Sequence, residues 1–158
     1  MTVTQYSVEP LIGVRPVLLG MSRAESRERM RTTPLSFKKA ALLFPNAPDV
    51  DAYHDVSFQL FFDESDRVEY IELSKSPDFG VNYKGIDVFG LRAEDLVALI
   101  SQDASFDPDH PELGYSYVFP LLEMSVWRPT IPDPEETDPE WTTFATVGVG
   151  RKGYYSKA

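Results

Sequence analysis

Apolar and polar residues alternate most regularly near the middle of the chain. Apolar side chains recur at every second position of residues 56–62, at Val56, Phe58, Leu60 and Phe62. This period of two is typical of a half-buried strand. A polar turn at residues 63–66 separates it from a second β-rich run at residues 67–74. The pattern predicts an antiparallel hairpin over residues 56–73.

Weaker β-rich runs lie on both sides of this hairpin. They cover residues 2–8, 14–19, 81–83, 86–89, 115–119, 122–127 and 141–150. The first run is expected to be an edge strand, and Pro16 suits an edge or the start of a strand. A second hairpin is expected over residues 122–150. Residues 32–48 are expected to form an irregular loop or a short helix.

Two segments carry helix signals. Ser22 is followed three residues later by Glu25, a capping box in which each side chain satisfies a free backbone N–H. We expect a helix over residues 23–31 with its Arg and Glu side chains in water. A second helix is predicted over residues 92–101, whose apolar residues share one face at helical spacing. These apolar residues are Leu96, Leu99 and Ile100.

The two helix starts are alike. One reads Gly20-Met21-Ser22-Arg23-Ala24-Glu25 and the other reads Gly90-Leu91-Arg92-Ala93-Glu94. Each precedes a β-rich stretch, so a helix followed by antiparallel hairpins occurs twice. We expect one α+β domain over residues 1–158, an antiparallel sheet of six to eight strands with two helices packed on it. Two pseudo-repeats, residues 14–75 and 84–158, are one interpretation of this order.

The helix start Gly-apolar-Ser/Thr-Arg-Ala-Glu, followed by an antiparallel sheet, resembles the repeat of β-lactamase inhibitor protein and of the BamE-like lipoproteins. The resemblance covers residues 20–73 and, more loosely, residues 90–155. The chain departs from both groups, because it lacks the disulfides of the inhibitors and the lipoprotein signal. The resemblance implies a concave sheet that binds another protein.

Charge narrows the choice of partners. The net charge is -10, and residues 49–158 carry twenty-two acidic side chains against eight basic ones. Such a field repels phosphate backbones and anionic lipid and attracts basic partners. We therefore expect a basic protein partner, with no nucleic acid and no membrane. Residues 1–48 are net positive, and six basic side chains there could still contact an anion. They are Arg23, Arg27, Arg29, Arg31, Lys38 and Lys39.

Few residues suggest catalysis. The chain has no cysteine, which excludes disulfides, thiolate metal sites and a Cys nucleophile. Residues 148–153 match Gly-x-Gly-x-x-Gly, but a dinucleotide site needs a helix after the pattern and only five residues follow. No cofactor is predicted. His54 and His110 lie among acids, but neither a calcium-loop nor a zinc-protease spacing is present, so no metal site is predicted.

The acidic loop at residues 128–140 is the candidate interaction site. Its acids are Asp133, Glu135, Glu136, Asp138 and Glu140. Its four prolines favour an extended chain that projects these carboxylates outward, too polar to order itself. Trp127 and Trp141 bracket the loop, and on facing strands they would pack as a cross-strand pair. The alternative interpretation is a solvated loop that only connects strands.

These observations favour a non-catalytic, protein-binding domain. In its sharpest form it is an inhibitor or immunity-type protein that neutralises a basic partner. The first ten residues show no signal peptide, so the cytoplasm is the expected compartment. The alternative function is an enzyme that acts on a small ligand or through a metal ion and uses His54 or His110.

Overall fold

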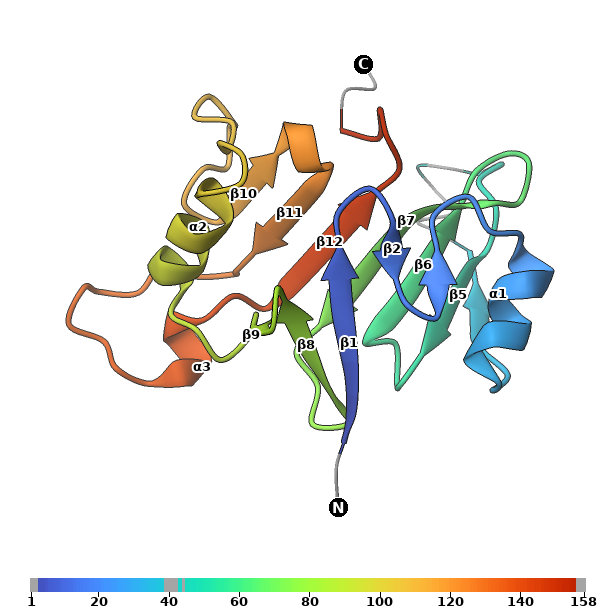
Figure 1. Ribbon diagram of the computed structural model, residues 1–158, viewed down its shortest axis with the longest axis horizontal. Coiled ribbons are helices and arrows are strands. Elements are labelled where there is room, and N and C mark those ends of the chain that lie inside the picture. Colours follow the sequence, from blue (N-terminus) through green and yellow to red (C-terminus); the bar gives the residue numbers. More distant parts are fainter. Residues whose placement is uncertain (1–2, 39–42, 44, 156–158) are drawn as a thin grey trace.

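The computed structural model describes residues 3–38, 43 and 45–155 and has an α+β fold with two sheets (Figure 1). The large sheet is antiparallel, with the strand order β10-β11-β12-β7-β6-β5-β4. Its strands are β4 (Leu35–Phe37), β5 (Val50–Tyr53), β6 (Phe58–Phe62), β7 (Val68–Ser74), β10 (Ser116–Phe119), β11 (Met124–Trp127) and β12 (Thr146–Gly150). These seven strands confirm the predicted antiparallel sheet of six to eight.

A small sheet of five strands forms a second layer, in the order β3-β2-β1-β8-β9. Its strands are β1 (Thr4–Glu9), β2 (Gly13–Val14), β3 (Val17–Leu18), β8 (Phe79–Tyr83) and β9 (Ile86–Asp87). The pairing of β1 with β8 is parallel. The expectation of a single antiparallel sheet is therefore wrong here, as is that of an edge strand at residues 2–8, because β1 lies between two partners.

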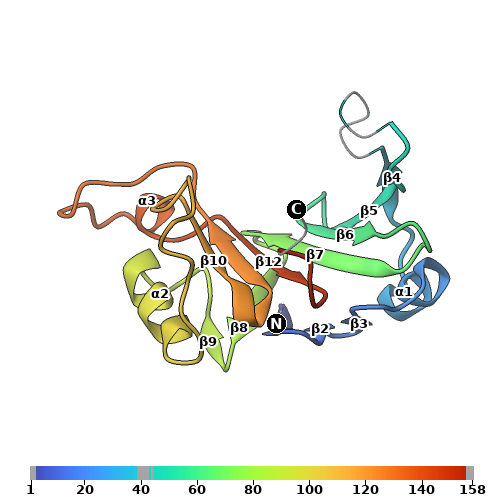
Figure 2. The ribbon, with the colours of Figure 1, turned by 90° about the horizontal axis from the view of Figure 1, so that it is seen from above.

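The helix α1 (Arg23–Met30) lies at one end of the molecule, and α2 (Ala93–Ser101) and the short α3 (Pro139–Thr142) lie at the other end (Figure 1). The structure also has the 3-10 turn η1 (Pro120–Leu122). Both expected helices are confirmed, and the Ser22 hydroxyl caps α1 by accepting the Glu25 N–H. In Figure 2 the small sheet, with α1 beyond one edge and α2 beyond the other, lies on one face of the large sheet.

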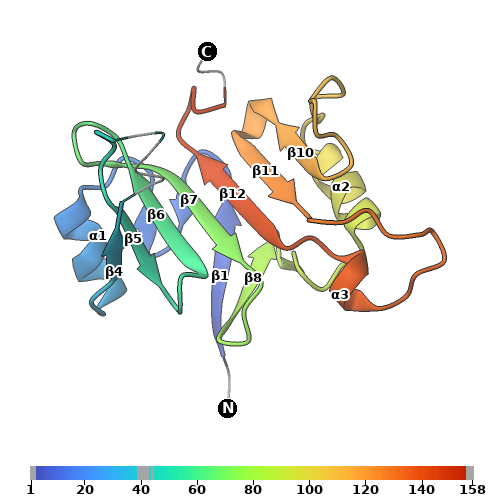
Figure 3. The same ribbon diagram turned by 180° about the vertical axis from the view of Figure 1, so that it is seen from behind.

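The large sheet therefore has a covered inner face and an outer face, which Figure 3 shows from behind. One row of paired residues is fully buried on the inner face: Val126, Val147, Leu73 and Phe58. The next row points outward: Ser125, Gly148, Glu72 and Gln59. The inner row packs against buried residues of the small sheet and of α2 to form one core. The alternation of buried and outward residues along these strands follows because successive side chains of a strand point to opposite faces.

The predicted hairpin over residues 56–73 is confirmed as β6 and β7, but its start is shifted. Val56 lies before β6 in a turn with φ 64 and is exposed. The apolar strand β5 and the short β4 are not predicted by the pattern. Residues 39–42 and 44, within the predicted loop or helix, lie outside the described residues.

Equivalent elements follow each other twice along the chain. A two-stranded hairpin, a helix and antiparallel strands follow one another in both β2-β3-α1-β4-β5-β6-β7 and β8-β9-α2-β10-β11-β12, and the short β4 has no counterpart in the second series. β7 and β12, the last strands of each series, are neighbours in the large sheet. This is the order on which the pseudo-repeat interpretation depends. A common origin of the two halves stays a prediction.

Candidate functional site

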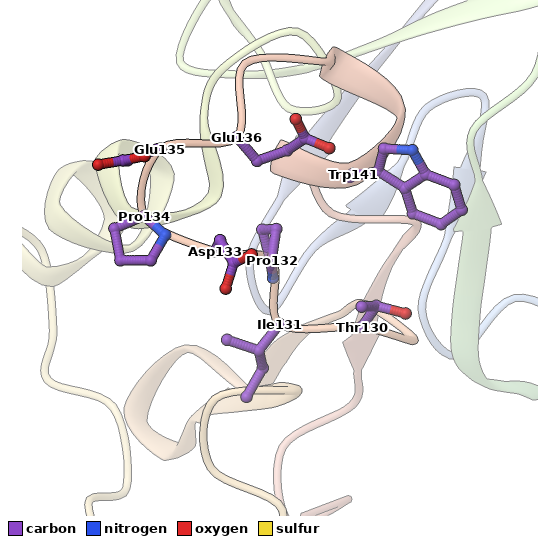
Figure 4. A pocket seen from close by; sticks show the side chains of 8 residues that line it. All are labelled: Thr130, Ile131, Pro132, Asp133, Pro134, Glu135, Glu136 and Trp141. Atoms are coloured by element: carbon purple, nitrogen blue, oxygen red, sulfur yellow. The ribbon is translucent and has the colours of Figure 1, made fainter.

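The acidic loop encloses an open hollow of about 780 Å³ between β11 and α3. We call this the acidic hollow; its lining residues are Thr130, Ile131, Pro132, Asp133, Pro134, Glu135, Glu136 and Trp141. Figure 4 shows the Trp141 indole on the opposite side from Pro134 and Glu135. Four of the seven predicted site residues thus meet at one place. Trp127, Asp138 and Glu140 do not line it.

Two arginines fasten the loop to the rest of the fold, one from within the loop and one from outside it. Arg128 is only 3% exposed, and its Nε donates to the Gly114 carbonyl at 2.9 Å. Arg92, beside the start of α2, donates from Nη1 to the Glu136 carbonyl at 2.9 Å and from Nη2 to the Pro134 carbonyl at 3.3 Å. The expectation of a loop that cannot order itself is wrong on this point, because Arg128 is a buried anchor and not a solvated side chain.

The carboxylates of the loop are left without cations. Among the described residues, no Lys or Arg side chain forms an ion pair with any of the five acids of the loop. Asp138 has a structural role, since its side chain caps α3 by accepting the Glu140 N–H at 3.0 Å. Arg92 contacts carbonyl oxygens of the loop and not its carboxylates. Arg128 bonds the Gly114 carbonyl and pairs with Glu94, both outside the loop. The carboxylates that line the acidic hollow therefore have no ion-pair partner in the part of the chain that the structure describes.

The predicted cross-strand pair of tryptophans is wrong. Trp127 lies on β11 opposite Thr146, whereas Trp141 lies on α3. The reason is a local helix start, with Asp138 as the N-cap and Pro139 in the first turn. The strand expected over residues 141–150 therefore begins only at Thr146. Both indoles are exposed, Trp127 to 39% and Trp141 to 43%. Of the two, only Trp141 lines the acidic hollow.

The acidic hollow belongs to a larger acidic end of the molecule. Residues 93–140 contain twelve acidic side chains and a single arginine, a net charge of -11, so the rest of the chain sums to about +1. Figure 1 shows α2, α3, β10 and β11 together at one end, with α1 at the other. Such a separation gives the molecule a strong field at that end, which accelerates association with basic molecules.

A second charged cluster, which the sequence pattern does not reveal, lies under α1. Asp51 on β5 is fully buried and accepts hydrogen bonds from Arg23 at 2.9 Å, Arg27 at 2.8 Å and Ser36 at 2.6 Å. Burial alone would raise the pKa of Asp51, but the hydrogen bonds from Arg27 and Ser36 and the two positive charges outweigh it and lower the pKa. This cluster fastens α1 to β5 and β4.

The cluster around Asp51 contradicts the expectation that the Arg side chains of α1 all lie in water. Arg23 and Arg27 do not form a solvated face, because Asp51 engages both, and the Arg23 guanidinium also lies 3.9 Å from the centre of the Phe62 ring. Lys38 pairs with Asp49, and Lys39 lies outside the described residues. Of the six, the described ones that are exposed and have no buried partner are Arg29, Arg31 and Lys38.

The two histidines form hydrogen bonds and ring contacts within the fold. His54 Nε2 lies 2.9 Å from the Tyr6 hydroxyl, and the His54 ring packs on Phe79. His110 Nδ1 accepts the backbone N–H of Glu112 at 3.1 Å in a turn. Within the described ranges, no group of three or more His, Asp or Glu side chains is placed to hold a metal ion.

Comparison with known proteins adds no relative. Among the described residues, no helix has both the length and the apolar character needed to cross a membrane. The chain matches no protein-family model, and searches of curated proteins and of solved structures found no similar chain. The resemblance to β-lactamase inhibitor protein and the BamE-like lipoproteins therefore stays a prediction, and the interpretation of the site depends on its geometry.

Proposed function

We propose that the protein is a non-catalytic binding domain that recognises a basic protein through the acidic hollow. The observation that carries this proposal is that one hollow is lined both by carboxylates without an ion-pair partner and by the exposed Trp141 indole. A partner Lys or Arg side chain in the hollow would meet both. A cation over an indole gains about 0.5–2 kcal/mol, and nearby carboxylates add charge-assisted hydrogen bonds.

The arrangement of the loop favours fast and tight recognition. Arg92 bonds the loop backbone and Arg128 anchors the loop to Gly114, so little conformational entropy is lost when a partner binds. The field of the acidic end steers a basic partner toward the hollow, an effect that salt weakens. Inhibition of that partner in the cytoplasm, as by an immunity protein, is the sharpest form of the proposal.

Two variants of equal net charge test the proposal. The hollow variant carries Asp133→Asn, Glu135→Gln and Glu136→Gln in the lining and Glu140→Gln elsewhere in the same loop, and leaves the cap Asp138 intact. The control variant carries Glu28→Gln, Asp55→Asn, Glu64→Gln and Asp78→Asn, all at exposed positions elsewhere. The binding of an arginine-rich decapeptide is measured by calorimetry.

The hollow variant should weaken binding of the decapeptide by at least about tenfold, the effect of losing about 1.4 kcal/mol. The control variant should weaken it far less. Equal weakening in both variants would mean that only net charge matters and would contradict the proposal. Where a toxic basic protein is encoded beside its gene, co-expression of the two tests the inhibitory form: the native protein should restore growth and the hollow variant should not.

A further inference from the structure

A second polar cluster lies on the outer face of the large sheet, away from the acidic hollow. At its centre is Gly148 of β12, with Ser125 of β11 on one side and Glu72 of β7 on the other. Because Gly148 has no side chain, the Tyr70 hydroxyl occupies the space that a Cβ would fill. The Tyr155 hydroxyl lies 2.6 Å from Ser125 Oγ.

The end of the chain completes this cluster. Glu123 accepts the backbone N–H of Gly153 at 2.8 Å and that of Tyr155 at 2.9 Å, which turns residues 153–155 back over the sheet. The Tyr154 ring stacks on Tyr70 with ring centroids 4.6 Å apart, and the Tyr155 ring meets both edge-on. The result is a fixed wall of three tyrosines beside Glu72.

Glu72 is a half-buried carboxylate without a cation in the described part of the chain. The ionisable groups that interact with it are the phenols of Tyr70, Tyr154 and Tyr155, and the uncharged Gln59 is its neighbour on β6. Burial raises the pKa of Glu72, and a hydrogen bond with Tyr70 offsets only part of this effect. An unpaired, partly desolvated carboxylate gains more from a cation than a fully solvated one does.

We propose that Glu72 and its tyrosine wall form a second contact site, which receives an arginine side chain of a basic protein partner. Arginine fits better than lysine, because its planar guanidinium stacks on aromatic rings and bonds a carboxylate with two donors. The site rests on the charge and the rings around Glu72. It does not depend on the acidic hollow, whose residues it does not share.

The probe for this site is N-acetyl-arginine methylamide, with the lysine analogue for comparison. Carboxyl and amide signals of labelled protein are followed by NMR as the probe is added at several pH values. Saturable shifts are expected at Glu72, Ser125 and Tyr155, and bound probe should lower the pKa of Glu72. Glu72→Gln should weaken binding about tenfold, whereas Glu64→Gln, an exposed glutamate in the β6–β7 turn, should not.

Further variants distinguish this site from the acidic hollow and from pairing of Glu72 with a lysine of the same chain. The hollow variant should leave the Glu72 response intact, so either site can fail without the other. Shifts that do not saturate, or that persist unchanged in Glu72→Gln, would overturn the proposal. It would also be overturned if Lys157→Gln raised the pKa of Glu72 as much as the probe lowers it, because the cation would then come from the chain itself.

Discussion

Replacing the buried Asp51 with Asn should destabilise the protein by about 3 kcal/mol. Removal of one partner from a buried ion pair costs roughly 3–5 kcal/mol. The lower end applies here, because the Arg27 side chain is 42% exposed and can return to water. Arg23, only 14% exposed, keeps its bonds to Asp66 and to the Asp49 carbonyl. The loss therefore falls mainly on the contact of α1 with β5.

The same carboxylate should make stability depend on pH. Burial opposes ionisation, but bonds from Arg27 and Ser36 lower the pKa of Asp51 below its ordinary value of 3.8. A group whose pKa is lower in the folded state stabilises that state above the unfolded pKa, and this contribution disappears as pH falls through the folded pKa. Below about pH 4 the native protein should therefore lose stability faster than Asp51→Asn does.

Urea unfolding at pH 7 and at pH 3 measures both effects. Asp55→Asn is the matched control, because Asp55 is an exposed aspartate just after the same strand. The free energy of unfolding should fall by about 3 kcal/mol in Asp51→Asn and hardly change in Asp55→Asn. A loss below about 1 kcal/mol, the range of a surface pair, together with an unchanged pH profile would refute the assigned role of Asp51.

Three smaller changes test other contacts. Ser22→Ala removes the cap of α1 and should cost about 1 kcal/mol in thermal unfolding, whereas no loss would mean that the cap is dispensable. Arg128→Ala should cost about 1–3 kcal/mol by leaving the Gly114 carbonyl unpaired, and should speed amide exchange in the acidic loop; unchanged exchange would contradict the anchoring role. Gly148→Ala should destabilise by about 1–3 kcal/mol, because the new methyl overlaps the Tyr70 hydroxyl. Full stability would show that Tyr70 can move away.

Local patterns predicted the parts of the fold that depend on neighbouring residues. The β6–β7 hairpin follows from strict alternation, and α1 follows from its Ser22 cap. The parallel pairing of β1 with β8 joins segments far apart in the chain, for which no local pattern exists. The start of α3 is a different case, since Asp138 and Pro139 carry a recognisable cap signal that the β-rich residues after them outweighed.

The residues of the candidate site could be predicted from the sequence, but the hollow that they line could not. The acids and Trp141 follow from the sequence of the loop, but the shape of the hollow depends on contacts with distant parts of the chain. Arg92 binds the loop carbonyl of Glu136, and Arg128 of the loop binds the Gly114 carbonyl. Asp51 shows the same limit. The pattern does not predict the buried strand Val50–Tyr53 and so does not show that Asp51 is buried, and only the folded structure brings Arg23 and Arg27 to it.

The fluorescence of Trp141 gives the most direct test of the acidic hollow as a binding site. In a Trp127→Phe background Trp141 is the sole indole, and an arginine-rich decapeptide is added at increasing salt. We expect a saturable change in Trp141 emission whose midpoint rises steeply with salt, and which disappears when Asp133, Glu135, Glu136 and Glu140 become amides. Emission that does not respond to the peptide, or that responds equally after these four substitutions, would contradict recognition of a basic partner at the hollow.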